Sequence, residues 1–238
     1  MKIDSGKLKD FIQKVTMNGS ITSILMNFGE EGVDVILKSL DNTTATIGKM
    51  NKTAFSEYVA IGEVGLKNVK NLITKLKTLS GMATIDIQNN RFIIYNIDNL
   101  GYERTWTEPV VKKDFVDNVL EAEPTMPFDG GVNIDGSILK EMVSNKIIVD
   151  SEYLTLTIKD KELTLITGED EREKSTLKMK CEYKDFSSKF GSVLDTAIAI
   201  LGDNINMACA DAYPIRFITS TEDYTIKLIV APCENKWN

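Results

Sequence analysis

The chain has 238 residues, of which 42% are hydrophobic and 26% are charged, and its formal net charge is −7. This composition is that of an ordinary globular protein, with room for one large domain or two smaller ones. The chain has no histidine, and its three cysteines, Cys181, Cys209 and Cys233, lack the paired spacing of a zinc site. These features argue against Ser-His-Asp or Cys-His catalysis and against a disulfide framework, so we expect no metal and no cofactor.

Two further features limit the partners. No apolar run approaches the roughly 20 residues that a membrane-spanning helix requires, and the N-terminus does not read as a signal peptide, so we expect an intracellular protein without a membrane partner. Residues 1–107 carry 13 basic and 11 acidic side chains, whereas residues 108–238 carry 15 and 24. If nucleic acid is a partner, the cations must therefore be concentrated on one surface.

The first half of the chain predicts helix, strands, helix, strands. Residues 7–15 have apolar side chains at helical spacing after Ser5, a plausible N-cap. Short, partly β-branched runs bounded by Gly, Asn and Asp predict strands at residues 24–28, 33–40, 45–50 and 54–61. A second helix is predicted at residues 64–79, followed by strands at 83–87 and 92–97.

The second half repeats this order. The predicted elements are a helix at 135–144, strands at 154–158, 163–167 and 176–183, a helix at 187–201, and strands at 205–210, 215–219 and 224–230. This duplication predicts an α+β fold with two similar domains, residues 1–107 and 129–238, each with two helices packed on antiparallel sheets. Residues 108–128 hold three of the five prolines and predict a long connector.

The order of elements and several short motifs resemble the DNA sliding clamp family, which includes proliferating cell nuclear antigen and the T4-type phage clamps. Residues 37–41 (Leu-Lys-Ser-Leu-Asp) and 43–47 are similar to a strand and loop motif of that family. Residues 206–211, 213–215 and 228–232 are similar to its C-terminal strands, the last of which ends in an apolar-x-Ala-Pro pattern. The histidine of the family's loop motif is absent here, and the last predicted helix is poor in cations.

The resemblance implies a protein that is not an enzyme. It would be a homotrimeric ring that encircles double-stranded DNA without reading its sequence and tethers DNA polymerase and other replication or repair proteins, with a clamp loader as a further partner. Three alternatives stay open: a clamp-like viral processivity factor that forms no ring, a specialised clamp subunit, and a hydrolase with paired carboxylates.

In that family, helices line the hole of the ring and their lysines meet the DNA phosphates. The residues that the resemblance places there are Lys9, Lys14, Lys67, Lys70, Lys75, Lys140 and Lys189. The sequence alone favours solvated faces of amphipathic helices, and the resemblance reverses this preference for Lys9, Lys67 and Lys75.

The resemblance also implies a cleft for short client peptides and two edge strands that join neighbouring subunits. The cleft residues would be Leu40, Ala45, Ile47, Leu120, Pro124, Met126, Phe128, Pro214, Ile229, Val230, Ala231 and Pro232. Leu40 and Ile229 are expected on its floor, with Pro232 as a wall nearer the surface. The edge strands would be residues 101–108 and 175–181, unless both are ordinary edges protected by charge.

Overall fold

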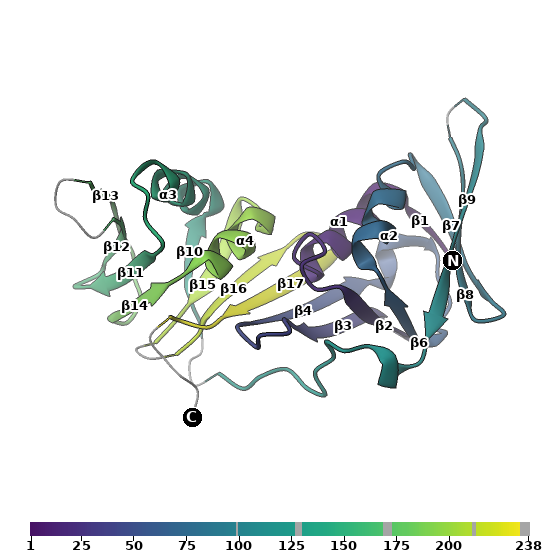
Figure 1. Ribbon diagram of the computed structural model, residues 1–238, viewed down its shortest axis with the longest axis horizontal. Helices are drawn as coiled ribbons and strands as arrows, with labels where there is room; N and C mark the ends of the chain where they lie inside the picture. The colour runs from purple at the N-terminus through teal and green to yellow at the C-terminus, as the bar shows by residue number, and fades with distance from the viewer. Residues whose placement is uncertain (99, 127–129, 169–172, 211–212, 234–238) are drawn as a thin grey trace. The chain divides into compact units, whose positions relative to one another are not determined.

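The computed structural model describes residues 1–98, 100–126, 130–168, 173–210 and 213–233, which form two compact units (Figure 1). Unit 1 comprises Met1–Glu123 and Ser220–Ile226, and unit 2 comprises Pro124–Thr219 and Lys227–Asn238. The turn before the last strand therefore belongs to unit 1, while the segments before and after it belong to unit 2. The predicted α+β architecture, with two helices in each half, is confirmed.

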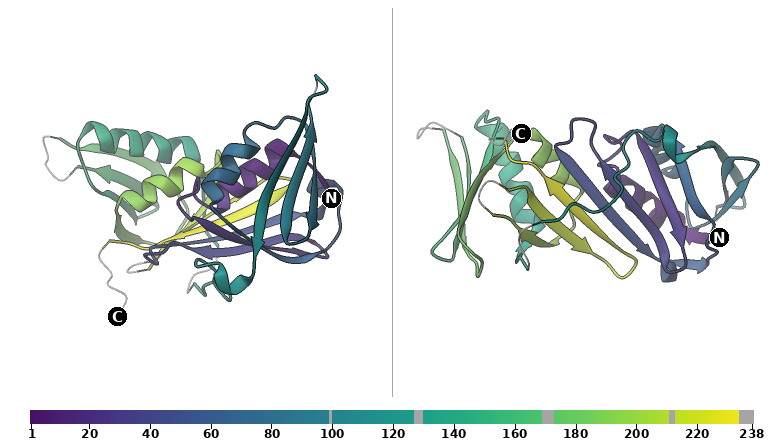
Figure 2. Two further views of the ribbon diagram at one scale, coloured as in Figure 1. Left: turned by 45° about the vertical axis from the view of Figure 1, so that its right-hand side comes forward. Right: turned by 90° about the horizontal axis from the view of Figure 1, so that it is seen from below.

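Unit 1 combines two helices with antiparallel strands. Helices α1 (Ser5–Val15) and α2 (Val69–Leu76) contact each other and lie on one face of the strands (Figures 1 and 2). The strands are β1 (Lys2–Asp4), β2 (Ser23–Gly29), β3 (Gly32–Lys38), β4 (Thr44–Asn51), β5 (Phe55–Glu57), β6 (Gly62–Lys67), β7 (Met82–Gln88), β8 (Arg91–Ile97) and β9 (Glu103–Val111). Their order is β4-β3-β2-β6-β9-β8-β7-β1-β5, and short 3₁₀ turns lie at Lys52–Ala54 and Lys113–Phe115.

Unit 2 has a similar plan. Helices α3 (Gly136–Ile148) and α4 (Ser192–Ile200) contact each other. Strands β11 (Leu154–Lys159), β12 (Glu162–Thr167), β13 (Ser175–Lys180) and β14 (Phe186–Phe190) form a sheet in the order β13-β12-β11-β14. Strands β10 (Val132–Asp135), β15 (Asn204–Ala208), β16 (Ile215–Ser220) and β17 (Tyr224–Val230) follow one another in the order β10-β15-β16-β17. The end of β16 and the start of β17, within Ser220–Ile226, belong to unit 1.

Local sequence explains how α1 begins and packs. The Asp4 carboxylate accepts a hydrogen bond from the Lys7 backbone N–H at 3.1 Å, so Asp4, and not the predicted Ser5, is the N-cap. Gly48 of β4 faces α1, and a Cβ there would collide with Val15. The missing side chain therefore lets α1 lie directly against the strand, and its apolar residues are buried there.

Two predicted helices are too long, because a strand precedes each one. Residues 64–67 belong to β6, and Asn68, with φ of 56°, separates that strand from α2. Residues 187–190 belong to β14, and Gly191 separates it from α4. In β14 the buried residues alternate, as expected for a strand. The helix predicted at residues 187–201 merged this strand with the helix that follows it. Lys67 and Lys189 therefore lie on strands, not on helix faces.

Two other predictions are corrected. Residues 108–111, assigned to the connector, complete strand β9. The predicted strand at 54–61 is reduced to β5 at Phe55–Glu57. Within the described ranges, no helix is both long and apolar enough to cross a bilayer.

Candidate functional site

The helices of unit 1 carry an excess of cations. Lys9 of α1 is half-buried, whereas Lys67 at the end of β6 and Lys70 of α2 are exposed. Lys77, directly after α2, is also exposed and was not among the predicted DNA contacts. Among the described residues these four ammonium groups have no ion-pair partner. They are therefore available to an anionic ligand.

Lys14, by contrast, is engaged within unit 1. Its ammonium nitrogen lies 3.0 Å from Asp10 and 2.6 Å from the Tyr224 hydroxyl, which in turn donates to Asp10. Burial lowers the pKa of Lys14, but the hydrogen bonds to Tyr224 and Asp10 outweigh it, so the pKa is raised. Burial, and then the hydrogen bond to Asp10, raises the pKa of Tyr224. The ammonium group is thus held between Asp10 of its own helix and Tyr224, the first residue of β17.

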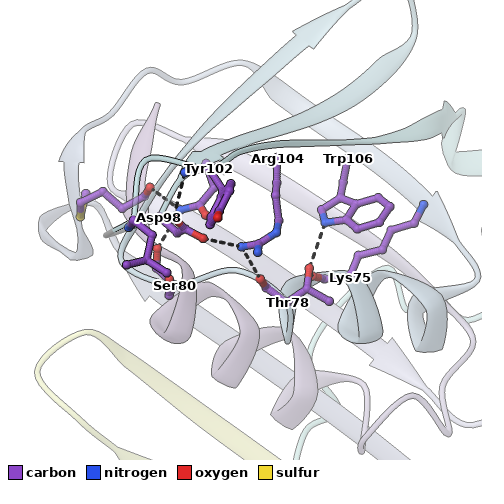
Figure 3. Close-up of polar contacts among 10 residues, drawn as sticks. Lys75, Thr78, Ser80, Asp98, Tyr102, Arg104 and Trp106 are labelled. Atoms are coloured by element: carbon purple, nitrogen blue, oxygen red, sulfur yellow. Dashed lines mark hydrogen bonds and ion pairs between the residues drawn. The ribbon is translucent and has the colours of Figure 1, made fainter.

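Lys75 is also engaged, at the C-terminal end of α2. Its ammonium nitrogen lies 2.6 Å from Glu108 of β9, whose side chain is only 8% exposed, and 5.4 Å from the centre of the Trp106 ring. The Trp106 indole N–H donates to the Thr78 hydroxyl at 3.2 Å, and Arg104 donates to the Thr78 carbonyl at 3.2 Å (Figure 3). These contacts connect the C-terminal end of α2 to β9, and Glu108 partly neutralises the charge of Lys75.

The helices of unit 2 differ from those of unit 1, because their charges sum to zero. Lys140 of α3 lies 3.8 Å from Asp203, and Lys189 of β14 lies 4.1 Å over the Tyr153 ring. Lys146 of α3 was not among the predicted contacts, and it is buried with its ammonium nitrogen 2.6 Å from Asp195 of α4. Unit 2 therefore offers fewer exposed cations on its helices than unit 1.

Each unit has a strand with an open edge. Within the described residues, β9 pairs with β8 from Glu103 to Pro109 but with β6 only at Val110 and Val111, so its outer side is open before that point. Strand β13 pairs with β12 alone and is the end strand of its sheet. These are the two strands predicted as edges, at 101–108 and 175–181.

The residues of the predicted client cleft are distributed over both units. In unit 1, Leu40 is 72% exposed, Ala45 is buried, and Ile47 and Leu120 are half-buried. The connector begins beside β3, since Leu120 N–H donates to the Ile36 carbonyl at 3.2 Å.

In unit 2, the remaining cleft residues are mostly covered. Pro124, Met126 and Ala231 are half-buried, and the buried residues are Pro214, Ile229, Val230 and Pro232. Pro232 was expected nearer the surface, and this expectation is wrong. Phe128 lies outside the described residues.

The sequence matches no protein-family model and no curated protein, but the structure is similar to solved structures. A proliferating cell nuclear antigen from Thermococcus kodakaraensis covers 98% of this chain and 98% of its own, with a TM-score of 0.82 and 14% identity. The A. fulgidus protein, solved with the C-terminal region of FEN-1 bound, covers 99% and 98%, with a TM-score of 0.81 and 12% identity. A PCNA2-PCNA3 complex from Sulfolobus tokodaii covers 99% and 100%, with a TM-score of 0.78 and 16% identity. The chain therefore has the fold of proliferating cell nuclear antigen, the sliding-clamp fold.

Proposed function

We propose that this protein is a DNA sliding clamp: an intracellular ring of three identical chains that encircles double-stranded DNA and tethers DNA polymerase and other replication or repair proteins to it. In this role the protein binds and does not catalyse. A clamp loader would open the ring and place it on DNA. The observation that carries the proposal is the sliding-clamp fold over 98% of the chain, together with the open outer edges of β9 and β13.

The open edges support assembly from copies of one chain. The backbone N–H and C=O groups on the outer side of β9 before Val110, and on the outer side of β13, have no strand partner within the described residues, and such groups favour pairing with another strand. Since β9 and β13 are different surfaces, pairing of one with the other is heterologous, and such contacts close into a ring if the rotation permits.

The unpaired lysines of unit 1 support the DNA contact. Lys9, Lys67 and Lys70 are the predicted contacts for which the described part of the chain offers no ion-pair partner, and Lys77 joins them. Long, flexible ammonium groups attract phosphates without reading bases, which suits a protein that slides. Lys14, Lys75, Lys140 and Lys189 are the predicted contacts that have partners inside the protein, and we expect smaller contributions from them.

We place the binding site for client peptides at the residues of the predicted client cleft. Short peptides that bind a groove gain most of their affinity from a few apolar anchors. Leu40 is the most exposed apolar side chain among the described residues of the predicted cleft and is therefore the best candidate for direct contact with a client.

A second candidate is a specialised clamp subunit that assembles with a different chain. It is favoured by the similarity to the Sulfolobus tokodaii structure, which is a complex of two different clamp proteins. In that case β9 and β13 of this chain would each pair with an edge strand of another protein.

Light scattering of the full chain tests the proposal. We expect three times the mass of one chain at micromolar concentration. Leu177→Pro, which removes a backbone donor from the edge strand β13, should give monomers that remain folded by circular dichroism. A wild-type chain that stays monomeric would contradict the homotrimer, and ring formation only after addition of a second clamp protein would identify the specialised subunit.

A further inference from the structure

Three consecutive apolar residues are exposed in the loop between β5 and β6. Val59 is 60% exposed, Ile61 is 41% exposed, and Ala60 between them is exposed as well. Single exposed apolar side chains are common on protein surfaces, but a run of three is unfavourable in water unless it serves a contact. These three residues are called the apolar loop below.

Both ends of the apolar loop are fixed to the rest of unit 1. At the first end, the Tyr58 hydroxyl can donate to the carbonyl oxygens of Gly29 and Gly32, which lie 2.8 and 2.7 Å away. At the other end, the Ile61 N–H donates to the Phe28 carbonyl at 3.1 Å. The loop is therefore held in place before any contact, so little conformational entropy is lost when a partner binds.

An acidic rim lies beside the apolar loop and consists of the exposed side chains of Glu30, Asp34 and Glu63. Burial raises the pKa of Tyr58, and the negative charges of Asp34 and Glu30 raise it further, which places both carboxylates near the Tyr58 hydroxyl. Glu63 lies two residues after the loop. In the described part of the chain these three carboxylates have no ion-pair partner, so the rim keeps its negative charge.

Two carboxylates of the rim point to the face of the strands that lies away from α1. Glu63 of β6 and Asp34 of β3 are both opposite Asn27 of β2, and Asp34 is also opposite Lys49 of β4. Opposite residues in antiparallel strands point to the same face. Because Gly48 faces α1, its neighbour Lys49 and the two carboxylates point to the other side. The rim is therefore on the opposite face from the lysines of the helices.

We propose that the apolar loop and its acidic rim bind a short segment of a partner protein in which lysine or arginine residues flank an apolar anchor. Val59 and Ile61 would contact the anchor, and the acidic rim would attract and orient the basic flanks. The same carboxylates disfavour nucleic acid and anionic lipid, because both present phosphates to the surface. They also disfavour a segment with acidic flanks.

This site is separate from the predicted client cleft. The apolar loop is held at the Gly32 end of β3, whereas Leu40 follows the Lys38 end. The seven residues of this extended strand separate the two ends by roughly 20 Å. A partner segment can therefore occupy the apolar loop while a client peptide contacts Leu40. The inference does not depend on the proposed ring, since all of its residues lie in unit 1.

Selection from a phage-displayed library of short random peptides tests the proposal. The library is selected on the full wild-type chain, on the double variant Val59→Ser, Ile61→Ser, and on Leu40→Ala. We expect a class of peptides that is lost on the double variant and retained on Leu40→Ala. Peptides of this class should carry basic residues on both sides of an apolar one. Both serine substitutions fall on exposed side chains, so the double variant should keep the wild-type melting temperature.

A synthetic copy of the most enriched peptide of that class then gives affinities by fluorescence anisotropy. The double variant Val59→Ser, Ile61→Ser should weaken binding by about tenfold or more, because it removes the apolar contact. Glu30→Gln with Glu63→Gln should weaken binding about threefold at low salt and little at high salt, since exposed charges are screened.

A matched control changes the net charge by the same amount at a distant place. Glu141→Gln with Glu152→Gln removes two exposed carboxylates from unit 2 and should leave the affinity of the peptide unchanged. Thermal melting identifies any variant that fails to fold. If the double serine variant does not fold, Val59→Ser alone replaces it in both experiments.

The outcomes separate this inference from the proposed ring. A selection in which no peptide depends on Val59 and Ile61 would overturn the inference, and so would a dependent class without basic flanks. A change in self-association of the double variant by sedimentation velocity would show that the loop contacts a second copy of the chain instead. A wild-type monomer would contradict the proposed ring, and the peptide selection on that monomer would still decide this inference.

Discussion

The ammonium nitrogen of Lys146 on α3 lies 2.6 Å from Asp195 on α4, although the Lys146 side chain is only 5% exposed. The second carboxylate oxygen of Asp195 is buried and has no hydrogen-bond partner in the described part of the chain. This pair joins the two helices of unit 2 and removes a lysine from the helix surface. Such a pair is costly to break, because removal of one partner leaves the other charge buried and uncompensated.

Removal of one partner of this pair should therefore destabilise unit 2. We expect Asp195→Ala to lower the free energy of unfolding by about 3 kcal/mol, because Lys146 would remain buried without a counter-charge. The apolar double variant Lys146→Met, Asp195→Leu should recover most of that loss. Urea unfolding followed by circular dichroism measures both, and equal losses in the single and double variants would contradict this account.

The exposed lysines of unit 1 should carry the attraction to DNA. Lys67→Glu with Lys70→Glu should reduce the affinity for linear duplex at low salt and lower the slope of log affinity against log salt by about two. Lys49→Glu is the matched control, since Lys49 is exposed on β4 next to Gly48, which faces α1, and so points to the other face of the strands. Fluorescence anisotropy measures all variants, and an unchanged slope in the double variant would reject the assignment.

Leu40 should contact client peptides. Its side chain is 72% exposed, so Leu40→Ala should leave the melting temperature unchanged while it weakens binding of a client peptide by about 1–3 kcal/mol. Ile229→Ala is the contrasting variant. Ile229 is 4% exposed, and its truncation should mainly lower stability. Calorimetric titration together with thermal melting separates the two effects, and equal affinity for wild type and Leu40→Ala would place the client site elsewhere.

The turn after β8 should be sensitive to acid. The Asp98 carboxylate accepts hydrogen bonds from the backbone N–H groups of Tyr102 at 2.9 Å and Leu100 at 3.0 Å and pairs with Arg104 at 3.1 Å. The Tyr102 hydrogen bond first, then those of Leu100 and Arg104, hold the pKa of Asp98 below its ordinary value of 3.8. Because the folded pKa is depressed, its stabilising contribution is present above the ordinary value and is lost as the pH falls through the folded one.

NMR can follow that loss directly. The amide resonances of Leu100 and Tyr102 should shift with a midpoint below pH 3.8, and Asp98→Asn should abolish the transition while the rest of the spectrum is retained. A midpoint at or above the ordinary value would show that the turn does not hold the ionised carboxylate.

Sequence alone determined the helix and strand plan, because apolar periodicity is a local property. The stripe of α1 predicted its buried face, and the repeated order of elements predicted two similar units. The same local rule failed at residues 64–67 and 187–190, where only one residue, Asn68 or Gly191, separates a strand from the helix that follows. These residues form strands because Leu66 pairs with Ile24 and Phe190 pairs with Leu154. Both partners are distant in the chain, so local sequence does not reveal the pairing.

Tertiary structure alone decided which lysines are available. Lys14, Lys70 and Lys75 all lie on polar helix faces, and the sequences of their own helices do not fully show which ammonium groups are paired and which are available. Tyr224 lies 210 residues from Lys14 along the chain, and Glu108 lies 33 residues from Lys75. Folding brings these acceptors to two of the ammonium groups and leaves Lys70 exposed. Charge availability depends on three-dimensional proximity, and sequence periodicity carries no information about it.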